Sequence, residues 1–168
     1  SMFDAVKMET ILLSGFMEEF LELVKDEIEE AGITLRTHWG QEASYIVADP
    51  RALIQVLRNI ISNAKDALQG RSQPEIIIQS QALDNFMAIA ISDNGHGISR
   101  DQQRYLFHPF RTTKHHGTGL GLSITKKILA SMGGSISIAS QANIGTSVKI
   151  LIPKGVANAA VQEDVQDL

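Results

Sequence analysis

Two glycine-rich segments carry the residues best suited to chemistry in this chain. The first is Asp93-Asn-Gly-His-Gly97, and the second is Gly117-Thr-Gly-Leu-Gly-Leu122. A carboxylate at a strand exit can accept a hydrogen bond from an exocyclic amine, and the glycines beside it let a flat base approach the main chain. A glycine cluster that opens a helix presents free N–H groups to phosphate oxygens. Together these parts suit a purine nucleoside triphosphate.

The segment between the two glycine clusters is a short basic loop. It contains Arg111, Lys114, His115 and His116, and it is anchored by Phe107 and Phe110. Such a loop can close over phosphates as a lid. The glycine cluster after it is not a Walker motif, because no Lys-Ser/Thr pair follows, and not a Rossmann fingerprint, because no strand precedes it.

Simpler structural explanations exist for each of these segments taken alone. Asp-Asn-Gly is also a common turn between two strands. The basic loop can equally be a solvated segment with two core phenylalanines. The order in which the segments occur, and the elements around them, must therefore decide between the explanations.

Asn59 and Asn63 lie one helical turn apart, so their side chains can converge on one face of a helix. Amide oxygens are hard neutral ligands for Mg²⁺, which keeps several waters and sits between a few protein oxygens and the substrate phosphates. Asn63 is the candidate metal ligand. Two amides that only hydrogen bond to the nearby backbone would give the same pattern.

Hydrophobic periodicity predicts the elements that position these residues. Apolar steps of three and four residues predict helices over 14–31, from Pro50 to near Gly70, and over 119–132, with Asp49 as the cap of the second helix. Strands are predicted over 33–37, 45–48, 75–82, 86–92, 135–139 and 146–152. The first is expected to form a hairpin with the second, the third to pair with the fourth, and the fifth to connect to the sixth through a turn at 143–145. We expect an α/β two-layer sandwich, in which a mixed, mostly antiparallel sheet of about five strands packs against three helices.

Composition limits the classes of partner. The 168 residues are 43% hydrophobic, which fits one globular domain, and the net charge of −4 comes with no basic stripe, so no nucleic acid partner is expected. The absence of cysteine excludes disulfides, thiolate metal sites and thiol nucleophiles. No apolar stretch approaches the roughly 20 residues of a membrane helix. We expect no membrane contact by this fragment and a cytoplasmic location, even where a longer parent protein is anchored in the inner membrane.

The ends of the chain differ from its middle. Ser1 ahead of Met2 is typical of a remnant left by tag cleavage, so residues 1–8 are expected to be this remnant and a residual linker. Residues 9–153 are the expected domain. Residues 154–168 lack periodicity and are expected to form a flexible tail.

The ordered segments resemble the catalytic and ATP-binding domain of sensor histidine kinases, in the superfamily shared with gyrase, Hsp90 and MutL. Asn59-Ile-Ile-Ser-Asn63-Ala is similar to the N box of that family, Asp93-Asn-Gly-His-Gly97 to its G1 box, Phe107-His-Pro-Phe110-Arg-Thr-Thr-Lys114 to its F box, and Gly117-Thr-Gly-Leu-Gly-Leu122 to its G2 box. The resemblance covers residues 9–153 and implies the family's Bergerat-type sandwich. Asp66 stands where many members have Lys, which is similar to nitrogen- and dicarboxylate-sensing kinases.

The resemblance implies ATP and Mg²⁺ as cofactors, and it implies a role for each matching residue. Asp93 would bind the adenine amine, Thr146 would join Asp93 through an ordered water, and Asn63 and Asn59 would hold Mg²⁺. Asn59, Asn63 and Lys114 would be the catalytic residues. The implied nucleotide contacts are Asn63, Asp66, Asp93, Gly95, Gly97, Ile98, Phe110, Arg111, Thr112, Thr113, Lys114, Gly117, Thr118, Gly119, Leu120, Gly121, Leu122 and Thr146.

The residue four positions before Asn63 indicates whether the domain hydrolyses ATP or transfers its phosphoryl group. ATPases of the superfamily place a glutamate there to activate water, whereas this chain has Asn59, whose amide cannot act as a general base at neutral pH. A neutral histidine imidazole needs no proton removed before attack, so histidine is the expected acceptor. A nucleotide-binding module without transfer activity and a serine kinase of the anti-sigma-factor type are the alternatives.

None of the five histidines stands in the acceptor setting of this family; they are His38, His96, His108, His115 and His116. The expected acceptor is therefore on a separate helical hairpin, which is the dimerisation and phosphoacceptor domain of the parent protein. A response regulator is the expected indirect partner. We expect the fragment to be a monomer that binds ATP and ADP without labelling itself, and the parent to be a homodimer.

Overall fold

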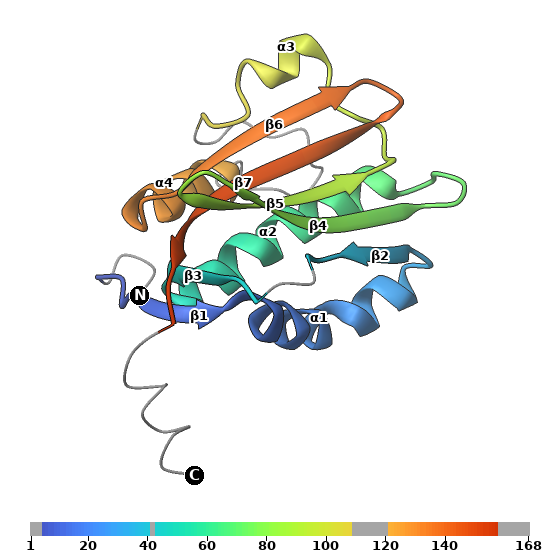
Figure 1. Ribbon diagram of the computed structural model, residues 1–168. Coiled ribbons are helices and arrows are strands. Elements are labelled where there is room, and N and C mark those ends of the chain that lie inside the picture. Colours follow the sequence, from blue (N-terminus) through green and yellow to red (C-terminus); the bar gives the residue numbers. More distant parts are fainter. Residues whose placement is uncertain (1–4, 41–42, 109–120, 158–168) are drawn as a thin grey trace.

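Helices cover one face of a mixed sheet in the computed structural model, which describes residues 5–40, 43–108 and 121–157 (Figure 1). The helices are α1 (Leu13–Glu30), α2 (Pro50–Leu68), the single turn α3 (Arg100–Gln103) and α4 (Gly121–Ser131). The strands are β1 (Glu9–Leu12), β2 (Thr34–His38), β3 (Tyr45–Ala48), β4 (Glu75–Leu83), β5 (Phe86–Asp93), β6 (Ser135–Gln141) and β7 (Gly145–Gly155). The expected α/β two-layer sandwich is confirmed.

The sheet has seven strands, and β7 is the strand that organises it. The order is β1-β3-β7-β5-β4-β2, with β6 also paired to β7. β6 and β3 share one edge of β7, because β6 pairs with residues 145–151 and β3 with Lys154 and Gly155. All pairs are antiparallel except β2 with β4.

Alternation along the strands places their apolar residues under the helices. Ile89 and Ile91 of β5 and Ile150 and Ile152 of β7 are almost fully buried, and the intervening residues point to the other face. From α2, the residues Leu53, Val56, Leu57, Ile60, Ile61, Ala64 and Leu68 complete the core. Because Asp93 is in step with Ile89 and Ile91, its side chain lies on this helix-covered face.

The start of α2 forms as expected from its sequence. Asp49 Oδ1 accepts hydrogen bonds from the backbone N–H groups of Arg51 (3.0 Å) and Ala52 (3.4 Å), and Pro50 occupies the first turn. Asp49 Oδ2 also accepts the N–H of Lys7 at 2.9 Å. The hydrogen bond from Lys7 is the main reason why the pKa of Asp49 is lowered.

Two expectations about the strands are wrong. β2 and β3 form no hairpin, since β2 pairs in parallel with β4 while β3 lies between β1 and β7. Burial explains the separation: Ile46 and Ala48 of β3 are fully buried and need an interior position, whereas β2 is mostly exposed and suits an edge. The sheet also exceeds the expected five strands. One strand that the sequence did not predict is β1, a four-residue edge strand that no turn residues separate from the helix after it.

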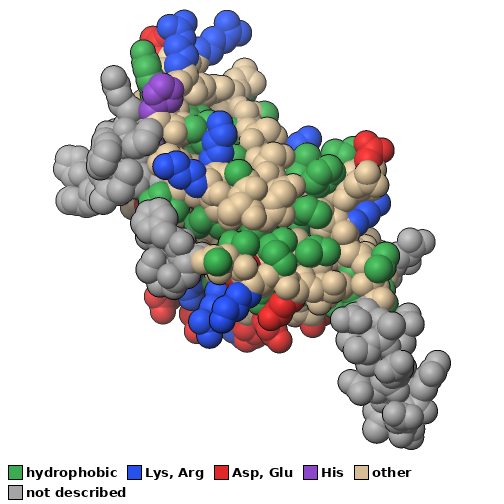
Figure 2. Space-filling model, turned by 90° about the vertical axis from the view of Figure 1, so that its left-hand side faces the viewer, with side chains coloured by type: hydrophobic (Ala, Val, Ile, Leu, Met, Phe, Trp, Pro, Cys, Tyr) green, Lys and Arg blue, Asp and Glu red, His purple; other side chains and the backbone are tan. Residues whose placement is uncertain are grey.

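Charge is unevenly distributed over the surface. Figure 2 shows Asp and Glu side chains gathered at the lower edge of one face, where α1 lies, with Lys and Arg side chains more widely spread. The exposed acidic residues of α1 are Glu18, Glu19, Glu22, Asp26, Glu27, Glu29 and Glu30. Among the described residues, no helix combines the length and apolar character that a membrane span requires.

Candidate functional site

The ends of β5 and β7 bring together the two residues expected at the adenine end of the site. Asp93 is the last residue of β5 and pairs directly with Thr146, the second residue of β7. Thr146 is buried and Asp93 is half-buried. A carboxylate and a hydroxyl are thus fixed on the same face of neighbouring strands.

Burial raises the pKa of the Asp93 carboxyl above its ordinary value. Hydrogen bonds from the backbone N–H groups of Gly95 and Thr146 lower the pKa, but their effect is smaller than that of desolvation. The Gly95 N–H donates to Asp93 Oδ1 at 2.8 Å. These two bonds fix the direction of the carboxyl group, whose oxygens keep lone pairs that can accept from a further donor.

The glycines beside Asp93 are required by the packing of the protein itself. A Cβ on Gly95 would lie 2.5 Å from the carbonyl oxygen of Ala67 in α2, and one on Gly97 would overlap the backbone at Gln141. Gly97 also has a φ of +70°, where a side chain is strained. The sequence-based explanation, that these glycines make room for a flat base, therefore misses their contacts with α2 and the β6–β7 hairpin.

Ser140 of β6 connects three backbone or side-chain groups of the site. Its Oγ accepts the N–H of Ile98 at 2.8 Å and donates to the carbonyl oxygen of Gly145 at 3.0 Å. The Oγ1 of Thr146 lies 2.8 Å from Ser140 Oγ. Since the Ser140 hydroxyl has one hydrogen, which Gly145 takes, Thr146 is the donor in the second bond. The Thr146 oxygen then has only acceptor capacity left for the site.

The loop after β5 is tied to the end of α2. The backbone N–H of His96 donates to the Ala67 carbonyl at 2.9 Å, and His96 Nε2 lies 2.7 Å from the Gln69 carbonyl oxygen. Arg71 bridges this loop to the β6–β7 turn, with Nε donating to Asn94 O at 3.1 Å and Nη2 to Asn143 O at 2.9 Å. Arg71 thereby holds the segments next to Asp93 and Thr146 in one arrangement.

The predicted N box lies on a half-buried face of α2. Asn59 and Asn63 are both half-buried, and the Asn59 Nδ2 donates to Thr125 Oγ1 of α4 at 3.3 Å. The Thr125 hydroxyl in turn donates to the Gly121 carbonyl at 2.8 Å. The helix that carries the N box is thus connected directly to the first turn of α4.

The phosphate end of the site is described only in part. Gly121 is exposed at the start of α4, and Leu122 is half-buried. Among the described residues, no atom lies within 4 Å of a Cβ built on Gly121. Asp66 is exposed on the last turn of α2. The other predicted phosphate-binding and lid residues lie outside the described residues; they are Phe110, Arg111, Thr112, Thr113, Lys114, Gly117, Thr118, Gly119 and Leu120.

Hydrogen bonds and one ring contact fix the described segment 98–107, which precedes the predicted lid. Ser99 and Gln102 form a reciprocal capping box at α3, and Gln103 Nε2 donates to Ile98 O at 2.8 Å and Ser140 O at 3.3 Å. Farther along, Lys126 Nζ lies 5.1 Å from the centre of the Phe107 ring. Ile98, a predicted nucleotide contact, is therefore held by hydrogen bonds at both its N–H and its carbonyl.

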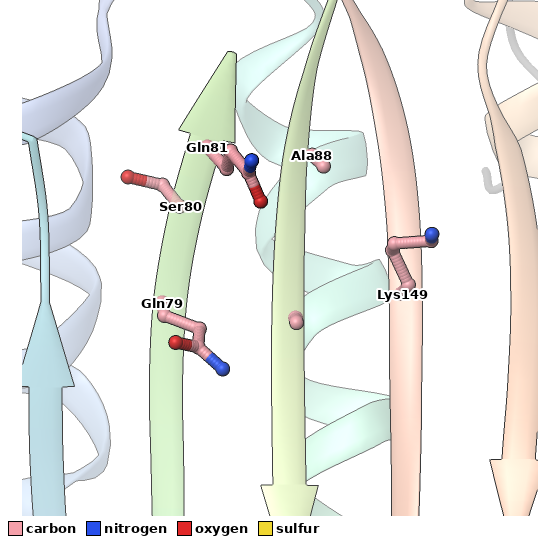
Figure 3. A pocket seen from close by; sticks show the side chains of 6 residues that line it. Gln79, Ser80, Gln81, Ala88 and Lys149 are labelled. Atoms are coloured by element: carbon pink, nitrogen blue, oxygen red, sulfur yellow. The ribbon is translucent and has the colours of Figure 1, made fainter. Parts of the chain in front are cut away.

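A shallow hollow on the opposite face of the sheet is separate from this site. Figure 3 shows its lining from β4, β5 and β7, with α2 behind the strands; the lining residues are Gln79, Ser80, Gln81, Ala88, Ala90 and Lys149. Ala88 and Ala90 alternate with Ile89 and Ile91, so they face away from the side of the sheet that carries Asp93.

Sequence reasoning did not identify three residues that hold the site together. Thr125 and Ser140 act through partners that are distant in sequence or need a known strand register, so no local pattern marks them. Arg71 had a weak local signal, since it lies three residues after Leu68, the last residue of α2, and a cation is favoured near a helix C-terminus. Its two carbonyl partners became visible only in the fold.

The family model of histidine kinase-, DNA gyrase B-, and HSP90-like ATPases matches residues 48–156. The chain is 38% identical over 146 residues to the signal transduction histidine-protein kinase AtoS of Escherichia coli, covering 86% of this chain and 24% of AtoS. It is 33% identical over 151 residues to sporulation kinase A of Bacillus subtilis, covering 90% of this chain and 24% of that kinase. The chain thus spans about a quarter of the length of these two relatives.

Solved structures agree with the sequence matches. The catalytic domain of histidine kinase ThkA superposes with a TM-score of 0.77 and 28% identity, covering 89% of this chain and 97% of that domain. ThkA in complex with the response regulator TrrA superposes with a TM-score of 0.73 and 26% identity, covering 88% of this chain and 42% of that one. The chain belongs to the histidine kinase-, DNA gyrase B- and HSP90-like ATPase family, as a catalytic domain of the type found in sensor histidine kinases.

Proposed function

We propose that this domain binds Mg·ATP and that its parent protein transfers the γ-phosphoryl group to a histidine on a separate helical hairpin. The observation that carries the proposal is the direct pairing of Asp93 with Thr146 on the helix-covered face of the sheet. Asn59 and Asn63 lie on helix α2, which packs against β5. An adenine-reading carboxylate and phosphate-side amides are therefore parts of one packed unit.

At the adenine end, Asp93 supplies the acceptor for the exocyclic amine. The N–H groups of Gly95 and Thr146 orient the carboxylate, and its remaining lone pairs would serve the base. Because Thr146 donates its hydrogen to Ser140, a water that bridges Thr146 and Asp93 would donate one hydrogen to each. The lone pairs of that water would then be free to accept from the ligand.

At the phosphate end, the donor set fits Mg²⁺. The described residues contain no cluster of three or more His, Cys, Asp or Glu that would bind a metal without a substrate. Asn59 and Asn63 would instead contribute neutral oxygens, and phosphate oxygens and water would supply the remaining ligands. Mg²⁺ held in this way would offset the negative charge on the phosphates during transfer.

The transfer itself needs little from this domain beyond positioning. A neutral imidazole nitrogen of the acceptor forms the new N–P bond as the bond between the γ-phosphorus and its bridging oxygen breaks, and ADP leaves. Asn59 in place of a glutamate favours transfer over hydrolysis, since an amide does not activate water. The names of the relatives and the solved complex of ThkA with a response regulator support a phosphorelay role.

Calorimetry and a transfer assay test the two parts of the proposal separately. The domain is titrated with ADP and with a non-hydrolysable ATP analogue, each with Mg²⁺ and with EDTA, and we expect saturable binding that Mg²⁺ strengthens. The acceptor hairpin of the parent is then added with labelled ATP, and we expect the hairpin to be labelled while the isolated domain is not. Absence of nucleotide binding contradicts the whole proposal. Binding without transfer to the hairpin leaves a binding module, and stable self-labelling of the domain contradicts the separate acceptor.

A further inference from the structure

We infer that Thr125 is a positioning residue that sets the orientation of the Asn59 amide and thereby prepares Asn59 to bind the metal. Thr125 lies in the middle of α4, and its side chain is fully buried against α2. The inference rests on the proposed function, because it concerns Mg²⁺ bound together with a nucleotide. It adds a residue from α4 that would not touch the metal or the nucleotide.

Hydrogen-bond geometry fixes the direction of both bonds at Thr125. Its hydroxyl lies 2.8 Å from the Gly121 carbonyl oxygen, which accepts and cannot donate. The single hydroxyl hydrogen is therefore used on Gly121, and Thr125 Oγ1 is left as an acceptor. The Asn59 group at 3.3 Å must then be the amide nitrogen and not the amide oxygen.

This direction matters because the two ends of an asparagine amide have nearly the same shape and opposite polarity. With its nitrogen held by Thr125, Asn59 keeps its oxygen for a cation, and no group among the described residues donates a hydrogen bond to that oxygen. A flipped amide would instead present N–H groups to Mg²⁺. Groups that orient metal ligands in this way typically change metal affinity about 10- to 100-fold when removed.

The same hydroxyl connects the two ends of the phosphate region. Gly121 is the last glycine of the predicted phosphate-binding cluster, and Asn59 is a predicted metal ligand. One buried oxygen thus ties the first turn of α4 to the metal-binding face of α2. A purely structural role would need only a side chain of the same volume at this place, which valine provides.

The test compares Thr125→Val, which removes the hydroxyl and keeps the shape, with Thr125→Ser, which keeps the hydroxyl. Ser131→Ala is the matched control, because Ser131 Oγ donates to the Ile128 carbonyl at 2.6 Å on the same helix and not to Asn59. For each protein, ADP affinity is measured by calorimetry with Mg²⁺ and with EDTA. The quantity compared is the gain in affinity that Mg²⁺ produces.

We expect T125V to reduce the Mg²⁺-dependent gain roughly tenfold or more while ADP affinity in EDTA is unchanged. T125S should restore the gain, and S131A should match the wild type. In an Asn59→Ala background, T125V should cause no further loss, because the residue it orients is gone. Thermal melting checks that each variant is folded, and Thr125→Ala replaces T125V should the valine variant fail to fold.

An unchanged Mg²⁺-dependent gain in T125V overturns the inference. Equal losses with Mg²⁺ and with EDTA also overturn it, because they indicate a general packing defect. Failure of the proposed function gives a different result, in which the wild-type domain itself shows no ADP binding or no gain with Mg²⁺.

Discussion

Asp93 and Thr146 are direct partners across β5 and β7, and the backbone N–H of Thr146 helps to hold the Asp93 carboxyl group. Burial nevertheless raises the pKa of Asp93 above its ordinary value. A raised carboxyl pKa means that the ionised form is less favourable in the folded domain than in the unfolded chain. The ionised Asp93 carboxylate therefore lowers the stability of the fold, which is typical of residues that bind a ligand.

Replacing Asp93 with Asn should therefore separate binding from stability. Asp93→Asn keeps an oxygen for the Gly95 N–H and removes the charge, so we expect ADP affinity to fall roughly 10- to 100-fold. Urea unfolding at neutral pH should show a variant that is at least as stable as the wild type. Calorimetry on the same samples measures the loss of affinity.

The difference in unfolding free energy between Asp93→Asn and the wild type should depend on pH. A carboxyl with a raised folded-state pKa contributes stability below its unfolded pKa and loses that contribution as pH rises through the folded pKa. The stability of Asp93→Asn relative to the wild type should hence increase from about pH 3 to pH 7. A variant that becomes relatively less stable over this range would contradict the role of burial.

Ser140 should be needed for both stability and nucleotide binding. Ser140→Ala leaves the Ile98 N–H and the Thr146 hydroxyl without their partner, so we expect a loss of about 1 to 3 kcal/mol in the free energy of unfolding. ADP affinity should fall as well, because Thr146 is no longer held as an acceptor. Ser137→Ala is the control, since Ser137 is exposed on the other face of β6. A free energy of unfolding equal to that of the control would contradict the stabilising role of the Ser140 hydroxyl.

The sequence predicted most of the helices and strands because their patterns are strong and local. The broad apolar stripe of α2, with Asp49 as its cap, and the paired β-rich runs that became β4 and β5 needed no tertiary information. The pairing of short strands did need it. β2 and β3 carry a turn-prone region between them, but burial of Ile46 decides where β3 lies, and that burial depends on β1 and β7.

The sequence predicted that Asp93 and Thr146 lie together, which the fold confirms, but it missed the residues that support them. The motif positions of Asp93, Asn59 and Thr146 follow from the order of the boxes, and the fold places Asp93 beside Thr146. Thr125 and Ser140 act through hydrogen bonds between elements, which a sequence does not display. The narrower similarity to nitrogen- and dicarboxylate-sensing kinases stays a prediction. The ligand-binding roles of Asp93, Asn59, Asn63, Thr146 and the lid residues stay predictions as well.

Arg71 should stabilise the arrangement of the two strand ends. Arg71→Met keeps the aliphatic length and removes the hydrogen bonds to the carbonyls of Asn94 and Asn143, so we expect a loss of about 1 kcal/mol in unfolding free energy, together with weaker ADP binding. Arg36→Met is the matched control, because the contact that Arg36 makes within the described part of the chain is a surface ion pair with Glu75, at 3.2 Å. Equal effects of the two variants on ADP affinity would show that Arg71 does not position the site.

A substitution at Gly95 tests why a glycine lies two residues after Asp93. Gly95→Ala would place a Cβ about 2.5 Å from the Ala67 carbonyl oxygen, so the loop or the end of α2 must move, and we expect a loss of about 1 to 3 kcal/mol in unfolding free energy. Gly15→Ala is the opposite control, because Gly15 lies in α1 with nothing within 4 Å of an added Cβ, and alanine there should stabilise the domain by up to about 1 kcal/mol. Urea unfolding and ADP titration distinguish the two explanations of Gly95. A variant with wild-type stability and lost ADP binding would show that the glycine serves the approach of the base, whereas loss of stability even without nucleotide shows that it serves the contact with α2.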